Sequence, residues 1–276
     1  MKLPSIFKDR SFLIPLSILL GIVVYIIVYP ALFIRVDPTR WYVVPKGLPP
    51  SQDYPFGTTL TGQNIADLVP IALRNSIVIG GTTALTSIAI AVVLSMLVVL
   101  VRKGVTATMT FIDTMCTIPP LPVLIVLLYG WRDYITMPLI GLILSIFGWA
   151  WPSRALISIL SSLRERTFIH TSYLSGLPTY LIMVKDFIPY ILRYILIGFV
   201  NLSLWGIGME TTVAMFGAMR MDIPTIGTTL YWSMHFQAFI LGLWWWYMIP
   251  TLFLIVFILS LYALGVKLDE YLTAGV

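Results

Sequence analysis

Six long apolar runs, separated by shorter polar stretches, set the pattern of the chain. Each run is close to or longer than the roughly 20 residues that an α-helix needs to cross the hydrocarbon core of a bilayer. The runs cover residues 12–34, 71–101, 109–129, 135–151, 190–215 and 239–266. This pattern predicts an all-α membrane protein with six transmembrane helices.

The composition supports the same class. Hydrophobic residues make up 59% of the chain, charged residues only 11%, and the mean hydropathy is +0.94, whereas about a quarter of the residues in soluble domains are charged. No polar stretch is long enough for a separate soluble domain, so we expect one bundle in contact with membrane lipid. The net charge of +5 is no signal for nucleic acid, and the single Cys116 cannot form an internal disulfide.

The basic residues predict which side of the membrane each polar stretch occupies. The first run is too long for the core of a signal peptide and lacks a small-residue cleavage site, which predicts a retained helix. Its basic flank predicts a cytoplasmic N-terminus. The same orientation leaves the C-terminus in the cytoplasm, together with most of the 17 basic residues. Those assigned to the cytoplasm are Lys2, Lys8, Arg10, Arg102, Lys103, Arg154, Arg164, Arg166, Lys185, Arg193 and Lys267.

The chain therefore divides into three parts. Residues 1–34 form the N-terminal tail and first helix, 35–70 an extracytoplasmic loop dense in Pro and Gly, and 71–276 a five-helix core. In the loop, we expect Asn64 to cap a short helix that Pro70 interrupts. In the core, residues 216–236 are mixed in character, which predicts an outer loop or a re-entrant segment.

Two ionisable residues fall within the apolar runs. Asp113 lies in the third run, and Glu210 lies near the outer end of the fifth. Such residues commonly mark a functional or paired position in a membrane protein. Pro119 and Pro120, with Pro122, must break or bend the third helix. We interpret Asp113, Pro119, Pro120 and Glu210 as a candidate solute path, with a structural hydrogen bond from Glu210 to a neighbouring helix as the alternative.

The segment 164–189 is the most unusual polar stretch. It contains five charged side chains and is expected to form short helical segments, separated by Gly176 and Pro178. It also exposes more large apolar side chains than a simple connector needs. We interpret it as a docking element for another protein within a cytoplasmic loop at about 153–190; the alternative is an amphipathic segment on the membrane surface.

Motifs for catalysis and nucleotide binding are absent. The sequence has no Gly-x-x-x-x-Gly-Lys-Ser/Thr loop, no His-Glu-x-x-His, no Gly-x-Ser-x-Gly and no cysteine cluster. His170 and His235 lack a second plausible ligand nearby, so we expect no metal and no cofactor in this chain. Energy for uphill transport would come from a partner ATPase or from an ion gradient.

Several short stretches follow one another along the chain: Tyr54-Pro55-Phe56-Gly57-Thr58, Gly62-Gln63-Asn64, Ala72-Leu73-Arg74-Asn75-Ser76, Asp113 with Ile118-Pro119-Pro120-Leu121-Pro122, Arg166-Thr167-Phe168-Ile169 with Gly176, Phe187-Ile188-Pro189, Glu210 with Val213-Ala214-Met215-Phe216-Gly217, and Leu264-Gly265. In this order they resemble the permease subunits of peptide-type ABC importers, and the second permease of the pair most closely. The resemblance implies the type I ABC importer permease fold. It also implies a prokaryotic cell-membrane location.

The resemblance assigns a role to the segment 164–189. In this family a coupling helix between the fourth and fifth spans docks on a cytoplasmic ATPase, and a solute-binding protein delivers the solute outside. The implied partners are a second permease, two ATPases that hold ATP and Mg, and an extracytoplasmic solute-binding protein. The implied docking residues are Arg166, Phe168, Ile169, His170, Thr171, Ser172, Leu174, Gly176 and Leu177.

The sequence departs from the family pattern at a few positions. His170-Thr171-Ser172 replaces the usual Glu-Ala-Ala, Thr59 replaces an Asp, and Gln63-Asn64 replaces Arg-Asp. These changes suggest a divergent branch. Peptides are the family default as solute, while related systems carry oligosaccharides or nickel, and few Asn, Gln and Cys residues are compatible with a thermophilic source.

Two other classes stay open on the residues alone. An ion-coupled secondary transporter would need coupling carboxylates or paired inverted repeats, and the sequence shows one strongly broken span and no convincing repeat. An intramembrane enzyme would need a catalytic pair at membrane depth, and none is visible.

Overall fold

The computed structural model describes residues 9–34, 36–101 and 105–274, and these residues form helices and connecting loops without a strand. The helices, in chain order, are α2 (Arg10–Phe33), α3 (Ile65–Val101), α4 (Val105–Thr117), α5 (Pro120–Trp131), the 3-10 helix η1 (Arg132–Tyr134), α6 (Met137–Gly148), α7 (Ala150–Arg164), α8 (Thr167–Leu174), α9 (Thr179–Ile182), the π-helix η2 (Met183–Phe187), α10 (Ile188–Met215), α11 (Ile226–His235) and α12 (Trp244–Ala274).

Four stretches are long and apolar enough to cross a bilayer. They are α2, α3, the stretch Thr179–Met215 that ends with α10, and α12. The bent pairs α4–α5 and α6–α7 raise the number to six if each pair is counted as one span. The predicted all-helical, multi-span architecture is confirmed, whereas six spans and the side on which the termini lie stay predictions.

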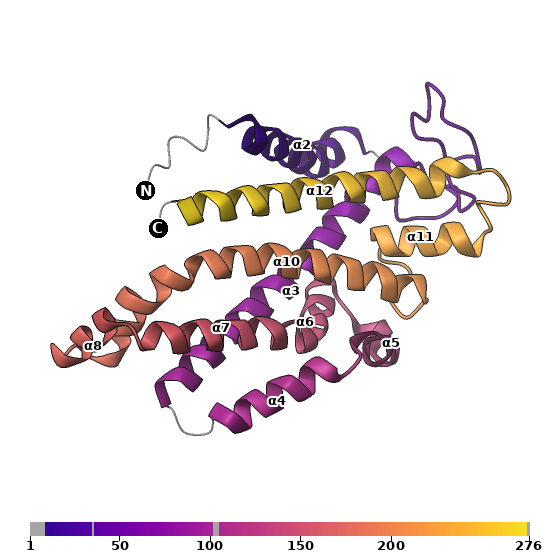
Figure 1. The fold of residues 1–276 in the computed structure, drawn as a ribbon. Coiled ribbons are helices and arrows are strands. Elements are labelled where there is room, and N and C mark those ends of the chain that lie inside the picture. Colours follow the sequence, from indigo (N-terminus) through magenta and orange to yellow (C-terminus); the bar gives the residue numbers. More distant parts are fainter. Residues whose placement is uncertain (1–8, 35, 102–104, 275–276) are drawn as a thin grey trace.

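α3 is the central helix of the bundle. It crosses the other long helices obliquely (Figure 1) and packs against α2, α6, α7, α10, α11 and α12. Its side chains enter separate hydrophobic clusters along its length: Ile65 and Val69 pack with Trp246 at one end, and Met96 with Leu160 near the other. α2 and α12 lie side by side along one edge of this core (Figure 1).

Pro70 lies inside α3, so the prediction that it interrupts the helix is wrong. Asn64 does act at the helix start, because its side-chain oxygen accepts a hydrogen bond from the backbone N–H of Ala66 at 3.1 Å. Proline lacks the N–H that would bond to the carbonyl four residues earlier, which here belongs to Ala66. The hydroxyl of Tyr25 in α2 donates to that carbonyl at 3.1 Å. A neighbouring helix therefore satisfies the carbonyl that Pro70 leaves free, as membrane helices require.

The proline cluster bends the third span, as predicted. α4 ends before Pro119 and α5 begins at Pro120, with an angle of 77° across the break. A second bend of 52° separates α6 from α7. The sequence pattern ended the fourth span at residue 151, whereas the structure continues as helix to Arg164.

The predicted loop 153–190 is largely helical. Only residues 165–166 and 175–178 lie outside helices, and the fifth span begins at Thr179 instead of residue 190. The π-helix explains the difference. The backbone N–H of Ile188 bonds to the carbonyl of Met183, five residues earlier, and this wide turn accommodates Pro189, which has no N–H to offer.

A chain of buried hydrogen bonds orders the loop 36–64. The side-chain amide of Gln63 donates to the carbonyl of Pro38 at 2.7 Å and accepts from the hydroxyl of Thr61 at 2.7 Å, and the Thr61 and Thr59 hydroxyls are 2.7 Å apart. The indole N–H of Trp245 donates to the carbonyl of Thr58 at 3.1 Å, which ties the loop to α12. Thr59 and Gln63, two positions that depart from the family pattern, thus bond within the same network.

The mixed stretch 216–236 folds back against the bundle. It contains the short helix α11, which packs against α10 and α12 (Figure 1). Ten residues of α-helix span only about 15 Å, which is too short to cross a bilayer. The end of the bundle that carries this segment and the loop 36–64 is called the outer end below.

Candidate functional site

Glu210 in α10 is fully buried, and hydroxyl groups surround its carboxylate. Oε1 accepts a hydrogen bond from Thr225 at 2.5 Å, and Oε2 accepts from Ser76 at 3.1 Å and from Thr211 at 3.5 Å. Ser76 lies in α3 and Thr225 immediately precedes α11, so one side chain joins three elements. A buried carboxylate needs such donors because losing water is costly for it. We call this group of hydrogen bonds the outer seam.

The outer seam also caps α11. The hydroxyl of Thr225 accepts a hydrogen bond from the backbone N–H of Thr228 at 3.0 Å, and the Thr228 hydroxyl accepts from the backbone N–H of Thr225 at 2.8 Å. This reciprocal pair is a capping box. Glu210 therefore sits at the N-terminal end of α11, where the helix dipole favours negative charge.

Two residues of α3 complete the seam. The hydroxyl oxygen of Ser76 accepts a hydrogen bond from the backbone N–H of Ile226 at 3.1 Å, and the side-chain amide of Asn75 donates to the carbonyl of Pro224 at 2.7 Å. The start of α11 is thus fixed to the middle of the bundle. These partners are about 150 residues apart in sequence, which is why the sequence analysis did not pair them, although Asn75 and Ser76 stood in one of its family-like stretches.

Gly227 allows the close approach of α11 to α10. A Cβ atom at this position would lie 2.7 Å from Cβ of Ala214, 2.8 Å from Cα of Thr211 and 3.0 Å from Oε1 of Glu210. Two of these atoms belong to rigid parts of α10, so a side chain at residue 227 would force the helices apart.

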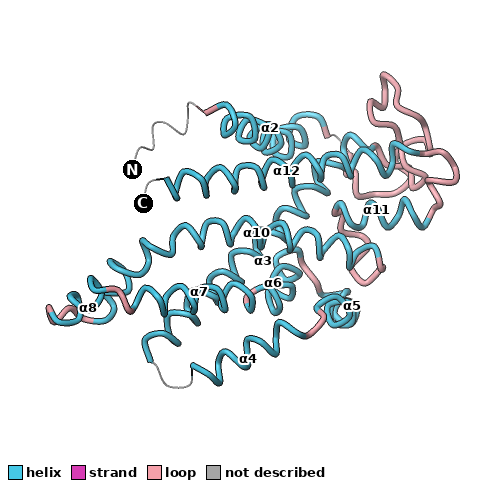
Figure 2. Tube along the Cα trace, viewed as in Figure 1, coloured by secondary structure: helices cyan, strands magenta, loops and turns pink. Residues whose placement is uncertain are grey.

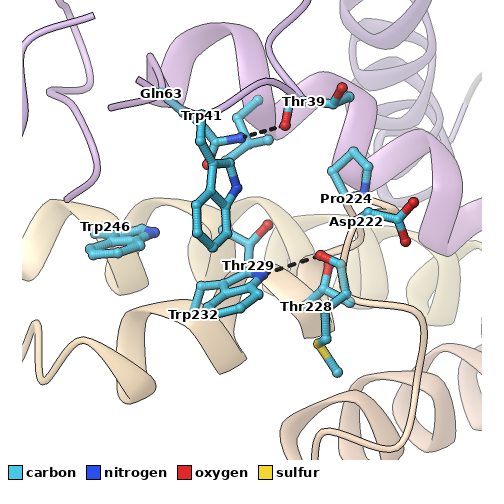
Figure 3. A pocket seen from close by; sticks show the side chains of 11 residues that line it. Thr39, Trp41, Gln63, Asp222, Pro224, Thr228, Thr229, Trp232 and Trp246 are labelled. Carbon is cyan, nitrogen blue, oxygen red and sulfur yellow. Dashed lines mark hydrogen bonds between the residues drawn. The ribbon is translucent and has the colours of Figure 1, made fainter. Parts of the chain in front are cut away.

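A small cavity lies between the loop 36–64 and α11 (Figure 3). Trp41 and Trp232, with ring centroids 4.8 Å apart, and Trp246 form its aromatic walls. Its free volume of about 30 Å³ fits one or two water molecules and is too small for a peptide or a sugar. The full lining is Thr39, Trp41, Gln63, Leu68, Met221, Asp222, Pro224, Thr228, Thr229, Trp232 and Trp246.

Asp222 at this cavity already has a cationic partner. Nη2 of Arg220 lies 2.7 Å from Oδ2 of Asp222, and Nε lies 2.7 Å from Oδ1. These hydrogen bonds from the guanidinium hold the pKa of Asp222 below its usual range. The cavity therefore offers aromatic surface and a neutralised ion pair.

The second candidate path residue, Asp113, belongs to a different contact. Its carboxylate lies 2.7 Å from Nη1 of Arg154, and this ion pair joins α4 to α7 with both side chains about half exposed. Pro119 and Pro120 lie at the bend between α4 and α5. In the described part of the chain no hydrogen bond or ion pair links Asp113 to Glu210, so the structure does not bring these two residues together.

α8 holds most of the predicted docking residues, with Arg166, Gly176 and Leu177 just outside it, and lies at the end of the bundle away from the loop 36–64 (Figure 1). Its C-terminal end is defined by Gly176, whose φ of +72° lies in the left-handed region that favours glycine. The backbone N–H of Leu177 bonds to the carbonyl of Ser172 at 3.4 Å, as in a Schellman cap. Gly176 thus ends the helix and turns the chain toward α9.

Two side chains attach α8 to the bundle. Ile169 is completely buried in a cluster that includes Ile182 and Phe187, and the ring of Phe168 stacks on Tyr190 with 5.2 Å between centroids. Just before α8, the guanidinium of Arg164 donates a hydrogen bond to the carbonyl of Val99 near the end of α3. α8 is therefore seated on α10 through Phe168 and on the cluster around Ile169, while Arg164, the last residue of α7, ties the chain just before α8 to α3.

The predicted docking residues other than Ile169 face outward to different degrees, and Phe168 does so while it stacks on Tyr190. Exposed are Arg166, Phe168, Thr171, Leu174, Gly176 and Leu177, while Ser172 is half-buried. Leu174 is 88% exposed. The side chain of His170 falls outside the described residues.

The sequence analysis missed two exposed apolar side chains, Tyr180 and Val184. They follow Gly176 in the same segment, 164–189. The signal that could have identified them is the presence of large apolar residues in a stretch that also carries charged side chains. No group of three or more His, Cys, Asp or Glu side chains in the described ranges lies close enough to hold a metal ion.

Residues 87–272, about two thirds of the chain, match the family model "Binding-protein-dependent transport system inner membrane component". The chain is 26% identical over 253 residues to the oligopeptide transport system permease protein OppC of Haemophilus influenzae. The matched region covers 86% of this chain and 80% of that protein. The chain is also 26% identical over 254 residues to the dipeptide transport system permease protein DppC of Bacillus subtilis, covering 86% and 77%.

Proposed function

We propose that this chain, which belongs to the family of binding-protein-dependent transport system inner membrane components, is a permease subunit of an ATP-driven importer of di- or oligopeptides. It forms half of the solute pathway beside a second permease in the cell membrane of a prokaryote. Two cytoplasmic ATPases bind and hydrolyse ATP, and an extracytoplasmic solute-binding protein delivers the solute. The names of the two similar permeases, for oligopeptides and for dipeptides, support the choice of peptides.

The observation that carries the coupling role is the contrast within α8. Ile169 is buried in the bundle, whereas Leu174, on the last turn, is 88% exposed. An exposed large apolar side chain on a seated helix fits a groove on another protein. We assign α8 and the following turn, with Tyr180 and Val184 added to the residues named from the sequence, as the ATPase-docking surface.

Seating gives α8 a route for transmitting motion. Phe168 contacts Tyr190 in α10, and Arg164, at the end of α7 just before α8, contacts Val99 in α3. In the proposed cycle the two ATPases close on ATP and move α8, and these contacts pass the displacement to two long helices. The chain itself needs no cofactor for this step.

The solute path is proposed to lie along the bent helices. Pro119 and Pro120 place a 77° break beside Asp113, and broken backbone within a membrane protein commonly lines protein or water. Glu210 contributes indirectly, by holding α11 against α3 and α10 through the outer seam.

The test is an affinity purification of the full chain from its native membrane, followed by mass spectrometry. We expect a second permease and ATPases with nucleotide-binding loops to accompany the wild-type chain. Leu174→Ser combined with Tyr180→Ser should remove the ATPases and keep the second permease. As a matched control, Leu252→Ser on α12 should keep both. Absence of any ATPase from the gently solubilised wild type would overturn the importer assignment in favour of an ion-coupled transporter.

Uptake by membrane vesicles tests the solute. With the binding protein present, ATP-dependent uptake of a labelled tripeptide that is insensitive to ionophores supports a peptide importer. Uptake of labelled maltotriose or nickel instead of the tripeptide, with the same ATP dependence, would keep the machinery and correct the solute.

A further inference from the structure

The turn between α11 and α12, residues 236–243, exposes three consecutive large apolar side chains. Phe239 is 79% exposed, Ile240 76% and Leu241 59%. We call this segment the outer turn. Figure 2 shows it at the same end of the molecule as the loop 36–64.

The outer turn is built as a firm structure. At its base Ala238 is completely buried and Leu243 nearly so, in a cluster with Trp245 and Trp246. The backbone N–H of Leu243 donates to the carbonyl of Ala238 at 2.8 Å, and further backbone bonds run from Leu241 to Gln237 and from Gly242 to Phe239. Because these peptide groups already have partners inside the turn, moving them out of water has a low cost.

The outer turn also continues an apolar surface that runs along a membrane span. Trp244, Met248 and Leu252 follow on α12 and are all exposed, and the ring of Phe239 lies 6.0 Å from that of Tyr247. No Asp, Glu, Lys or Arg occurs between residues 236 and 266. Trp and Tyr at the start of this surface suit the boundary between headgroups and hydrocarbon.

The neighbouring loop 36–64 differs from the outer turn because it carries charged side chains and a network of polar hydrogen bonds. It carries exposed charged residues, among them Arg40 and Asp53, and its polar side chains form the buried network described above. Charged side chains remain in water, because transfer to lipid is costly. The outer end therefore presents one charged segment and one uncharged, apolar segment.

We propose that the outer turn inserts Phe239, Ile240 and Leu241 into the outer leaflet, at the boundary between headgroups and acyl chains, while the loop 36–64 stays in water. The occupant of this surface is lipid. Protein interfaces carry about one hydrogen bond per 100–200 Å², and the three side chains at the tip are apolar and uncharged, so they offer no such bonds. Insertion would fix the membrane depth of the C-terminal end of α11, while the outer seam holds the N-terminal end of the same helix. The proposal does not depend on which solute is transported.

Spin labelling at single cysteines tests the proposal. Cys116→Ser removes the only cysteine of the chain, and Ile240→Cys then takes a nitroxide in the full chain reconstituted in liposomes with its co-purifying subunits. Leu252→Cys serves as the lipid control and Asp53→Cys as the water control. Oxygen, which enters lipid, and chromium oxalate, which is charged, report the surroundings of each label.

We expect the label at residue 240 to collide readily with oxygen, as at residue 252. Its collisions with chromium oxalate should be at least about tenfold fewer than those at residue 53. A free-energy cost of about 1.4 kcal/mol for moving the charged reagent from water into lipid produces this factor. Chromium oxalate accessibility equal to that at residue 53 would overturn the proposal. Protection from both reagents would also overturn it, by showing that protein covers the turn. Phe239→Cys repeats the measurement if the first variant does not reconstitute.

Discussion

The two ends of the bundle are held together by different kinds of contact. At the outer end, buried hydrogen bonds join segments far apart in sequence, as between Ser76 and Glu210 or Asn75 and Pro224. At α8, the hydroxyl of Thr171 bonds to the carbonyl of Thr167, one turn away in the same helix. Among the described residues, α8 is attached to the rest mainly by packing through Ile169 and Phe168.

This difference fits two mechanical roles. Buried hydrogen bonds between elements are expensive to break, because each separated group stays without a partner, so the outer seam favours a unit that moves as one piece. A helix seated by two apolar side chains, with its last turn exposed, is free to bind and to be displaced. The predictions below change one end at a time and compare the results.

The largest loss of stability is expected for Glu210→Ala. The change leaves the hydroxyls of Ser76 and Thr225 buried without their acceptor, at about 1–3 kcal/mol for each group. Thermal unfolding of the purified chain in detergent, followed by circular dichroism, measures the effect. Glu165→Ala, which removes an exposed acid next to α8, is the control, and a melting temperature equally unchanged in both variants would show that the seam does not stabilise the chain.

Ile169→Ala should act locally at the opposite end. Truncating a fully buried isoleucine costs about 2–5 kcal/mol, and here most of that loss should appear as detachment of α8 from its cluster. Hydrogen exchange of the peptide covering residues 167–177 should speed up, while exchange in α11 stays unchanged. The matched change Leu174→Ala removes a mostly exposed side chain and should leave both rates unaltered; equal acceleration in the two variants would refute the seating of α8 through Ile169.

Gly227→Ala tests the close contact inside the outer seam. The new Cβ meets Cα of Thr211 at 2.8 Å, and such overpacking typically costs about 1–3 kcal/mol. Gly208→Ala in α10 places its Cβ in open space, so it should be neutral or stabilise by up to about 1 kcal/mol through helix propensity. In a thermal unfolding series we expect Gly227→Ala to be destabilised and Gly208→Ala to be neutral or stabilised, and a stabilised G227A chain would contradict the packing.

The smallest effect is expected for Tyr25→Phe. It removes the hydroxyl that satisfies the carbonyl of Ala66, at a cost of about 1 kcal/mol. If Pro70 is the reason that this carbonyl is free, Tyr25→Phe should cost less in a Pro70→Ala background, where a backbone N–H is restored. A double-mutant cycle of unfolding free energies measures the coupling, and strict additivity would rule out the link.

Much of the helical framework was predictable from the sequence, because apolar length decides a membrane span. The run at 12–34 and the proline break after α4 follow directly from residue chemistry. The end of the fourth span and the start of the fifth did not, because the apolar runs stop at residue 151 and resume at residue 190, next to Pro152 and Pro189. The structure accommodates them within helix, at the first turn of α7 and beside the π-turn of η2.

The candidate site was predictable only in part. Glu210 stood out as an ionisable residue in an apolar run, and a structural hydrogen bond was one of its two interpretations. Its partners Ser76 and Thr225 were not identifiable, since hydroxyl side chains are common. Ser76 lies 134 residues from Glu210 and Thr225 lies 15 residues from it, and neither separation leaves a local pattern. Around α8 the charge pattern indicated the segment, whereas the burial of Ile169 depends on tertiary packing that one sequence does not reveal.

Hydrogen exchange with and without the ATPase that the proposed function requires tests the central claim most directly. On addition of the ATPase, the account predicts slower exchange in the peptide covering residues 167–177 and unchanged exchange in the peptide covering residues 223–235. The outer seam should be protected in both states, because its backbone and side-chain groups are buried and bonded. Equal exchange of α8 with and without the ATPase, or protection that appears at α11 instead, would contradict the account.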